Sequence, residues 1–227
     1  MIGHKKNKLR VLTLLVVGAL SITMTRAAIA VVAAPTMPAN QALKLLLEGN
    51  QRFVAGQLEH PNQTPDRRAE VAKGQHPFAS VLACSDSRTP PEIIFDRGLG
   101  DIFTVRVAGN VADKVVIESL DYSVKHLGVR VVMVLGHRRC GAVIAAVEGH
   151  EEEGDVGPML GELRPAVAAS KGMPGDPIEN AVRENVKLVM KNLATSSELS
   201  AMVKSGELKI VGGIYDLDTG TIEMLKD

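Results

Sequence analysis

Residues 129–141 decide the fold, and they read VRVVMVLGHRRCG. The first part, Val129 to Leu135, is a nearly continuous apolar run rich in β-branched side chains. Such a run predicts a central strand of a parallel sheet, because a strand in that position is buried on both faces. The chain then turns, and we expect a helix over residues 136–147 directly after the strand.

Strand and helix patterns alternate outward from this stretch. Apolar runs predict further strands over residues 78–83, 102–107 and 208–215, and a last short segment, after a turn, over residues 221–225. The spacing of apolar residues predicts helices over residues 39–54, 68–73, 113–127, 160–170, 178–193 and 197–204. We therefore expect an α/β fold, with a mostly parallel central β-sheet flanked by helices and the first helix as an N-terminal helical arm.

Two polar segments directly follow buried strands. Residues 84–88 read CSDSR and follow the strand expected at 78–83, whereas residues 137–140 read HRRC and follow the strand at 129–135. In open parallel sheets, ligands gather at the carboxyl ends of the strands. If the two strands are neighbours, the two segments meet in one crevice.

The residue types in these segments suit a metal ion. His137 and Cys140 are three residues apart, which places both side chains on one side of the turn into the helix. A cysteine in a first helical turn faces unpaired N–H groups and the positive end of the helix dipole, and both favour the thiolate. With Cys84 as third ligand, one position of a tetrahedral zinc site stays open, which is the catalytic pattern.

Asp86 and Arg88 add a carboxylate and its counter-ion to the first segment. Asp86 could fill the fourth metal position or stand beside it, and Arg88 is suited to a bidentate ion pair with the carboxylate. That pair would lower the proton affinity of Asp86. It would also decide whether Asp86 coordinates metal or accepts a hydrogen bond from bound water.

A disulfide bond is the competing interpretation of the two cysteines. The chain holds only Cys84 and Cys140, and exported chains commonly join their cysteines. A disulfide needs the same neighbouring strands as a metal site. The residue pattern alone therefore gives the two interpretations equal weight.

The N-terminal residues have the pattern of a targeting segment. Basic residues precede an apolar stretch over 11–24, and small residues follow. This pattern predicts a signal peptide within residues 1–34, cleaved after Ala30 or Ala34, so that the protein is exported to a periplasm or secreted. An uncleaved membrane anchor is the alternative, since the apolar character resumes after Arg26.

Length and charge limit the functions that residues 35–227 can have. Residues 35–227 suit one ordinary domain. The chain has 26 basic and 26 acidic residues, and no basic block occurs in this part. Phosphate binding normally needs clustered cations, so the composition argues against a nucleic-acid partner.

Further stretches extend the pattern around the two polar segments. These are GNQRF at 49–53, QHPF at 75–78, RVAGN at 106–110 and GIYD at 213–216. Together with CSDSR at 84–88 and HRRCG at 137–141, they resemble the β-class carbonic anhydrases. The resemblance runs from about residue 40 to the C-terminus, so that 35–227 would be a single catalytic domain of that type.

The resemblance implies how the site works. One zinc ion per chain would be bound by Cys84, His137 and Cys140, and carbon dioxide would be hydrated reversibly to bicarbonate and a proton by metal-hydroxide attack. Zinc lowers the pKa of bound water to about 7 in the unrelated three-histidine carbonic anhydrases. Asp86 would pair with Arg88 in an open, active state and bind zinc in a closed, inactive state, so activity should rise with pH.

Two further residues match the family by position. Gln75 lies where some members carry a glutamine that hydrogen-bonds the substrate near the metal, and a polar loop residue before Pro77 is the alternative. His126 lies close to where some members place a histidine suspected of carrying protons. A helix-end histidine on the surface, without a role, is the alternative there.

The family also implies an assembly and competing activities. Its members form homodimers and often homotetramers, with the active-site cleft at the interface between subunits. Relatives with this scaffold hydrolyse carbon disulfide or carbonyl sulfide, and a non-catalytic exported zinc-binding protein is a third hypothesis. Members regulated by bicarbonate use a tryptophan at a second site. This chain has no tryptophan, which weakens the case for such regulation.

Overall fold

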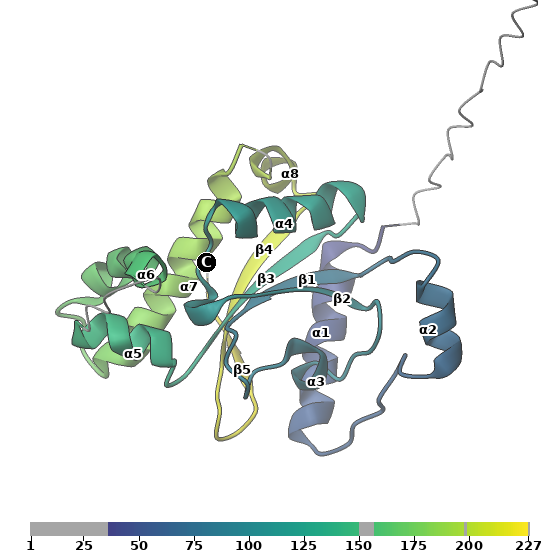
Figure 1. Ribbon diagram of the computed structural model, residues 1–227, viewed down its shortest axis with the longest axis horizontal. Coiled ribbons are helices and arrows are strands. Elements are labelled where there is room, and N and C mark those ends of the chain that lie inside the picture. The colour runs from purple at the N-terminus through teal and green to yellow at the C-terminus, as the bar shows by residue number, and fades with distance from the viewer. Residues whose placement is uncertain (1–35, 150–156, 198, 227) are drawn as a thin grey trace, which may run out of the picture. The chain divides into compact units, whose positions relative to one another are not determined.

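A twisted sheet with helices on both faces forms the centre of the chain (Figure 1). The computed structural model describes residues 36–149, 157–197 and 199–226. The expected signal peptide or anchor over residues 1–34 lies outside the described residues. Among the helices in the described ranges, none is long and apolar enough to cross a membrane.

The sheet has five strands in the order β2-β1-β3-β4-β5. The strands are β1 (Ala79–Ala83), β2 (Ile102–Arg106), β3 (Val131–His137), β4 (Lys209–Tyr215) and β5 (Ile222–Met224). The first four are parallel, and β5 pairs with β4 in the antiparallel sense. The mostly parallel sheet expected from the sequence is therefore confirmed. β1 and β3 are neighbours, with Ala83 opposite Leu135, so their carboxyl ends lie side by side.

The helices lie close to their expected positions. They are α1 (Ala39–Val54), α2 (Pro65–Val71), α3 (Pro91–Ile94), the 3-10 turn η1 (Ala108–Asn110), α4 (Lys114–His126), α5 (Gly141–Glu148), α6 (Gly157–Ser170), α7 (Pro177–Thr195) and α8 (Ser200–Ser205). Asp113 caps α4 by accepting a hydrogen bond of 2.9 Å from the N–H of Val116. Gly128, with φ 77°, follows the end of this helix and turns the chain toward β3.

The core has two parts, one on each face of the sheet. Side chains alternate along β3: Val132 and Val134 pack toward α4 and α7, whereas Met133 and Leu135 pack toward α1 and α3. Every residue of β1 and β3 is buried. This double burial explains why their sequences are apolar without alternation, and it makes the two strands a rigid base for the polar segments that follow them.

The expected helix over 136–147 is wrong at its start. Gly136 and His137 continue β3, where they pair with β4, and α5 begins only at Gly141. Between them Arg139 has a left-handed backbone with φ 53°, which no helix contains. α3 and η1 were not predicted, because such short helices carry no apolar period.

Candidate metal centre

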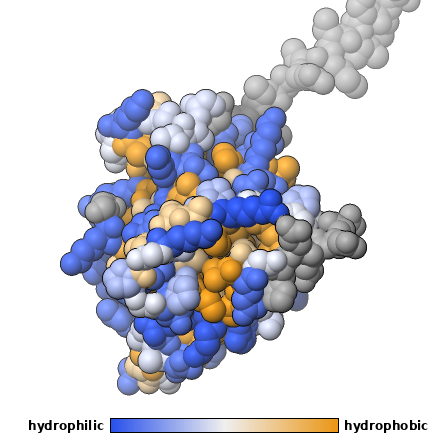
Figure 2. Space-filling model, turned by 90° about the vertical axis from the view of Figure 1, so that its left-hand side faces the viewer, coloured by the Kyte–Doolittle hydropathy of each residue, from blue (hydrophilic) through white to orange (hydrophobic). Residues whose placement is uncertain are grey.

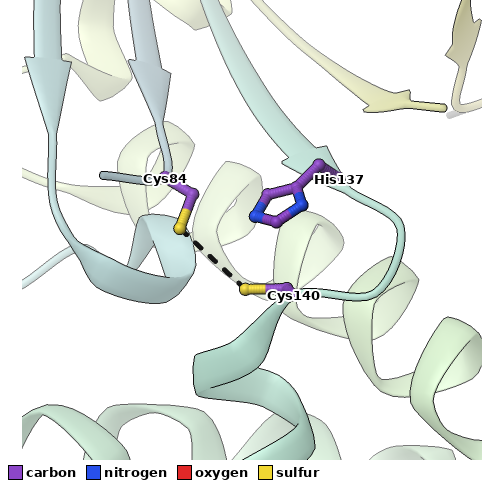
Figure 3. A group of neighbouring side chains, drawn as sticks. All are labelled: Cys84, His137 and Cys140. Atoms are coloured by element: carbon purple, nitrogen blue, oxygen red, sulfur yellow. Dashed lines mark hydrogen bonds between the residues drawn. The ribbon is translucent and has the colours of Figure 1, made fainter. Parts of the chain in front are cut away.

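Three side chains meet at the carboxyl ends of β1 and β3 (Figure 3). Cys84 directly follows β1, His137 is the last residue of β3, and Cys140 precedes the first residue of α5. Their ligand atoms all lie within 4.8 Å of one another, and all three residues are buried. The structure therefore brings together the three ligands expected from two separate segments of the sequence.

The distance between the sulfurs fits a metal better than a disulfide bond. The Sγ atoms of Cys84 and Cys140 are 3.9 Å apart, and both cysteines are free. Two thiolates bound tetrahedrally at Zn–S distances of about 2.3 Å would be about 3.8 Å apart, whereas a disulfide bond is about 2.05 Å long. The disulfide interpretation is thus not realised in this structure.

His137 presents one nitrogen to the two sulfurs without any partner of its own. Its Nδ1 lies 2.9 Å from the carbonyl oxygen of Arg138 and must donate its proton there, since that oxygen only accepts. This bond leaves the lone pair on Nε2, which is buried and has no hydrogen-bond partner among the described residues. An orphaned buried nitrogen is costly, and a metal ion at this point would satisfy it.

The two thiols titrate as a pair. The hydrogen bond from Cys140 holds the pKa of Cys84 below its usual range, and the N–H of Gly109, 3.3 Å from Sγ, adds to the effect. The same shared hydrogen bond and burial raise the pKa of Cys140, against a lowering by backbone N–H groups at the start of α5. The surroundings thus favour one thiolate, and a bound cation would favour two.

Asp86 stands beside the cluster and is held by Arg88. The guanidinium donates two hydrogen bonds to the carboxylate, 2.9 Å from Nε to Oδ1 and 2.7 Å from Nη2 to Oδ2. This pair keeps the pKa of Asp86 well below its usual range. Oδ2 also lies 3.8 Å from Nε2 of His137. The predicted bidentate ion pair is therefore present next to the metal ligands.

Arg106 organises the loop that carries Cys84 and Asp86, and the sequence analysis gave it no such role. Its side chain donates to the carbonyl oxygens of both residues, at 3.0 Å to Cys84 and 2.5 Å to Asp86. Arg106 ends β2, beside Ala83 in the sheet. An arginine at the carboxyl end of a strand next to a ligand-bearing strand was the available signal.

Gln75 is not brought to the cluster within one chain. It is exposed and precedes the amino end of β1, whereas Cys84 follows the carboxyl end of the same strand.

His126 also lies away from the metal ligands. It is the last residue of α4, where its ring lies 5.1 Å from that of Tyr122, and it is exposed. His126 precedes the amino end of β3, whereas His137 is its last residue, so the seven residues of the strand lie between them. A strand of that length spans roughly 20 Å. No direct proton transfer between the two histidines fits this placement.

The fold and the site together define a class of protein: an α/β protein with a Cys–His–Cys cluster, able to hold a metal ion, at the carboxyl edge of the parallel strands. The model of the family described as carbonic anhydrase matches residues 79–222. Carbonic anhydrase 2 of Mycobacterium tuberculosis is 44% identical over 187 residues, which cover 79% of this chain and 89% of that protein.

Two further proteins agree with this match. The carbonic anhydrase of Mycolicibacterium smegmatis is 38% identical over 188 residues, covering 81% of this chain and 91% of its own. The crystal structure of the β-carbonic anhydrase CafA of Aspergillus fumigatus superposes with a TM-score of 0.62 at 33% identity, covering 81% of this chain and 90% of that one. The chain belongs to the β-class carbonic anhydrase family.

Proposed function

We propose that this chain hydrates carbon dioxide reversibly to bicarbonate and a proton, with one zinc ion per chain held by Cys84, His137 and Cys140. The observation that carries the proposal is the convergence of two sulfurs and an orphaned imidazole nitrogen within 4.8 Å. Three protein ligands leave the fourth tetrahedral position open, as in catalytic rather than structural zinc sites. A zinc ion there supplies a Lewis acid that lowers the pKa of water.

In this proposal, Asp86 orients the water that attacks carbon dioxide. The carboxylate is ionised because Arg88 holds its pKa down, so it accepts hydrogen bonds and donates none. Oδ2 lies 3.8 Å from Nε2 of His137, close enough to reach a water in the fourth position. Arg106 fixes the backbone of Cys84 and Asp86 and keeps this geometry in place.

The pair between Asp86 and Arg88 also offers a way to close the site. While Arg88 occupies both carboxylate oxygens, Asp86 is turned from the metal position, which we take as the open state. Arg88 is half exposed, so its ion pair is easily exchanged for water. A freed Asp86 carboxylate would become the fourth ligand and exclude water, which is the closed state.

We infer that the working protein is a homodimer or homotetramer. Gln75 stands at the wrong end of β1 for its own metal centre, so a role in binding substrate requires the site of a partner subunit. Helix α5 is apolar along most of its length but buries only Val143. Figure 2 shows apolar side chains among hydrophilic ones on the face that carries α5 and α6, and a second copy would cover such a surface.

Export completes the proposal. Basic residues, an apolar stretch over 11–24 and small residues form the order of a secretory signal peptide. We propose a periplasmic or secreted protein, with an uncleaved membrane anchor as the outcome that would correct it.

The test combines kinetics and metal analysis on protein lacking residues 1–30. We expect about one zinc per chain, from the number of ligand sets, and stopped-flow hydration of carbon dioxide that rises between about pH 6.5 and 9. Cys140→Ser should lose both, because serine is a poor zinc ligand. Zinc without hydration would move the proposal to a sulfur analogue or to a binding role, and absence of zinc and of free thiols would restore the disulfide interpretation.

A further inference from the structure

We propose that Asp216 and Asp218, on the turn between β4 and β5, position the metal-binding loop by holding Arg138 and Arg139. The inference rests on the proposed zinc site, but it concerns how firmly zinc is retained and not the reaction. The aspartates do not touch the ligands, and they act through the arginines of the link between His137 and Cys140.

The link needs such support because its backbone is strained. Arg139 adopts φ 53°, in the left-handed region that β-carbon sterics disfavour for residues other than glycine. His137 and Cys140 stand on either side of this residue. If Arg139 relaxed to an ordinary conformation, the imidazole and the thiolate would no longer converge.

Two arginine–carboxylate contacts oppose that relaxation. Arg139 forms a bidentate pair with Asp218, with Nη1–Oδ2 at 2.8 Å and Nη2–Oδ1 at 2.7 Å. Arg138 lies 3.0 Å from Asp216 through Nη1 and Oδ2, and its Nε also lies 3.6 Å from Oε2 of Glu179 on α7, a third and longer contact outside the turn. The N–H of Arg138 also donates to the carbonyl oxygen of Tyr215 at 3.0 Å, so the link is tied to the end of β4 by backbone and side chains alike.

The turn that accepts these contacts is itself ordered. Oδ1 of Asp216 accepts the N–H groups of Asp218 at 2.8 Å and Thr219 at 3.1 Å, and the N–H of Gly220 donates to the carbonyl oxygen of Asp216 at 2.9 Å. A carboxylate on an ordered turn loses little conformational entropy when it binds an arginine. The turn keeps its conformation through its own hydrogen bonds, so its carboxylates can hold the link between His137 and Cys140 in place.

The position of Arg138 also determines the orientation of the proposed zinc ligand His137. The carbonyl oxygen of Arg138 accepts the Nδ1 proton of His137 at 2.9 Å, and this bond sets both the tautomer and the direction of Nε2. A shift of Arg138 would turn the ring away from the two sulfurs. Groups that orient a ligand in this way commonly change metal affinity when they are removed.

The experiment follows zinc release from the loaded protein to a chromophoric chelator in excess. Asp218→Asn keeps the size of the side chain and removes the charge that Arg139 pairs with. Because the pair is half exposed, we expect release to accelerate about threefold to tenfold, near the lower end of what ligand-orienting contacts contribute. Raised ionic strength should accelerate release from the wild type, and by a smaller factor from Asp218→Asn, where only the ion pairs of Arg138 remain to be screened.

The pair between Arg183 and Glu223 gives a matched control. It is also bidentate and partly exposed, with Nη1–Oε1 at 2.8 Å, but it joins α7 to β5 and does not touch the link. Glu223→Gln should release zinc at the wild-type rate. The double variant Arg139→Ala, Asp218→Ala should release zinc no faster than Arg139→Ala alone, because the two side chains act as one unit.

Three outcomes would overturn the inference. If Asp218→Asn releases zinc at the wild-type rate while the wild type holds zinc, the positioning role is wrong and the zinc site stands. If Glu223→Gln accelerates release equally, the effect is a general loosening of the sheet edge. If the wild type holds no zinc at all, the proposed function fails first, and this inference fails with it.

Discussion

At the scale of single residues, Asp86 is bound to Arg88 and not to the metal-binding cluster. Asp86→Asn should therefore leave zinc content unchanged but lower the rate of carbon dioxide hydration by about 10- to 100-fold, as expected for loss of a group that orients the reacting water. Stopped-flow kinetics and metal analysis on the same sample measure both effects.

The pH dependence of this variant separates orientation from titration. The pKa of Asp86 is lowered, so its carboxylate is ionised throughout the neutral and alkaline range. Asp86→Asn should accordingly lower activity most near pH 9, where the wild-type site is expected to be open, and less near about pH 6.5, because the variant also cannot close the site with a carboxylate. Asp113→Asn is the control, since asparagine also caps a helix, and it should keep full activity. A zinc-depleted Asp86→Asn protein would contradict the assignment.

Asp96 governs stability rather than chemistry. Its carboxylate is 2% exposed, and it accepts Nε of Arg52 at 2.6 Å and the N–H groups of Glu59 at 3.1 Å and His60 at 3.0 Å. Burial alone would raise its pKa, but these donors outweigh burial and lower it. Asp96 thus joins α1 and the loop at residues 59–60 to the end of α3.

The sign of this shift gives a pH-dependent prediction. A carboxylate whose pKa is lower in the folded than in the unfolded state stabilises the protein above the unfolded value of about 3.9, and this contribution disappears as pH falls through the folded pKa. Asp96→Asn keeps the left-handed backbone that Asp96 adopts. It should reduce the free energy of unfolding by about 3 kcal/mol at pH 7, with a shrinking difference below about pH 4. Urea unfolding at several pH values tests this, and a constant difference would contradict it.

At the scale of the elements, two helical glycines should respond oppositely to alanine. A β-carbon at Gly49 in α1 would overlap the carbonyl oxygen of Phe95, whereas no described residue lies within 4 Å of a β-carbon at Gly161 in α6. We expect Gly49→Ala to destabilise the protein by about 2 kcal/mol or more through overpacking. Gly161→Ala should stabilise it by about 0.5–1 kcal/mol through helix propensity. Thermal unfolding compares the pair, and equal shifts would show that α1 does not pack as described.

Elements whose stability comes from burial along their own length could be predicted from the sequence, whereas features that depend on a contact distant in the chain could not. The central strand was expected over residues 129–135 from a continuous apolar run, and the helix over residues 39–54 from apolar spacing. Both are found because burial stabilises each along most of its length, although the strand runs on to His137. The meeting of Cys84, His137 and Cys140 followed from their places after buried strands, whereas the choice of a metal site over a disulfide bond came from the family resemblance. The start of α5 did not, since it depends on Arg139, whose conformation is held by Asp218 across the fold.

Other features of the site were equally beyond a local pattern. Arg106 reaches the backbone of Cys84 from a neighbouring strand, and no spacing in the sequence encodes that contact. Gln75 and His126 matched the family by position in the chain, yet they flank β1 and β3 at the ends away from the cluster. The number of residues between a position and a metal ligand therefore does not by itself tell which edge of the sheet the position occupies. The direction of the strand must also be considered.

At the scale of the whole molecule, a metal at this site would connect the ends of β1 and β3 with the start of α5. Its ligands come from β1, β3 and the start of α5, so it binds only the folded chain. Zinc at a free concentration 100 times its Kd should raise the free energy of unfolding by about 2.7 kcal/mol. Calorimetry with and without a chelator measures this difference. In Cys140→Ser the difference should vanish, and a persistent one would place the metal elsewhere.

The proposed export leads to a separate prediction for protein that includes residues 1–34. Expressed in a bacterium, the full-length protein should be recovered outside the cytoplasm with its N-terminus at about residue 31 or 35, because signal peptides are cleaved after small residues. Replacing the basic residues before the apolar stretch with acidic ones should retain it in the cytoplasm. Recovery of the uncleaved protein in the membrane fraction would favour the anchor instead.

The arrangement of the ligands along the chain bears on the biosynthesis of the protein. His137 and Cys140 leave the ribosome almost together, but α3, β2, η1, α4 and most of β3 separate them from Cys84, which joins them only where β1 pairs with β3. A nascent or translocating chain therefore offers a cation two neighbouring ligands at most, which bind weakly on their own. A metal at this site would be acquired only after the sheet has assembled, so the compartment in which the chain folds would also have to supply the metal.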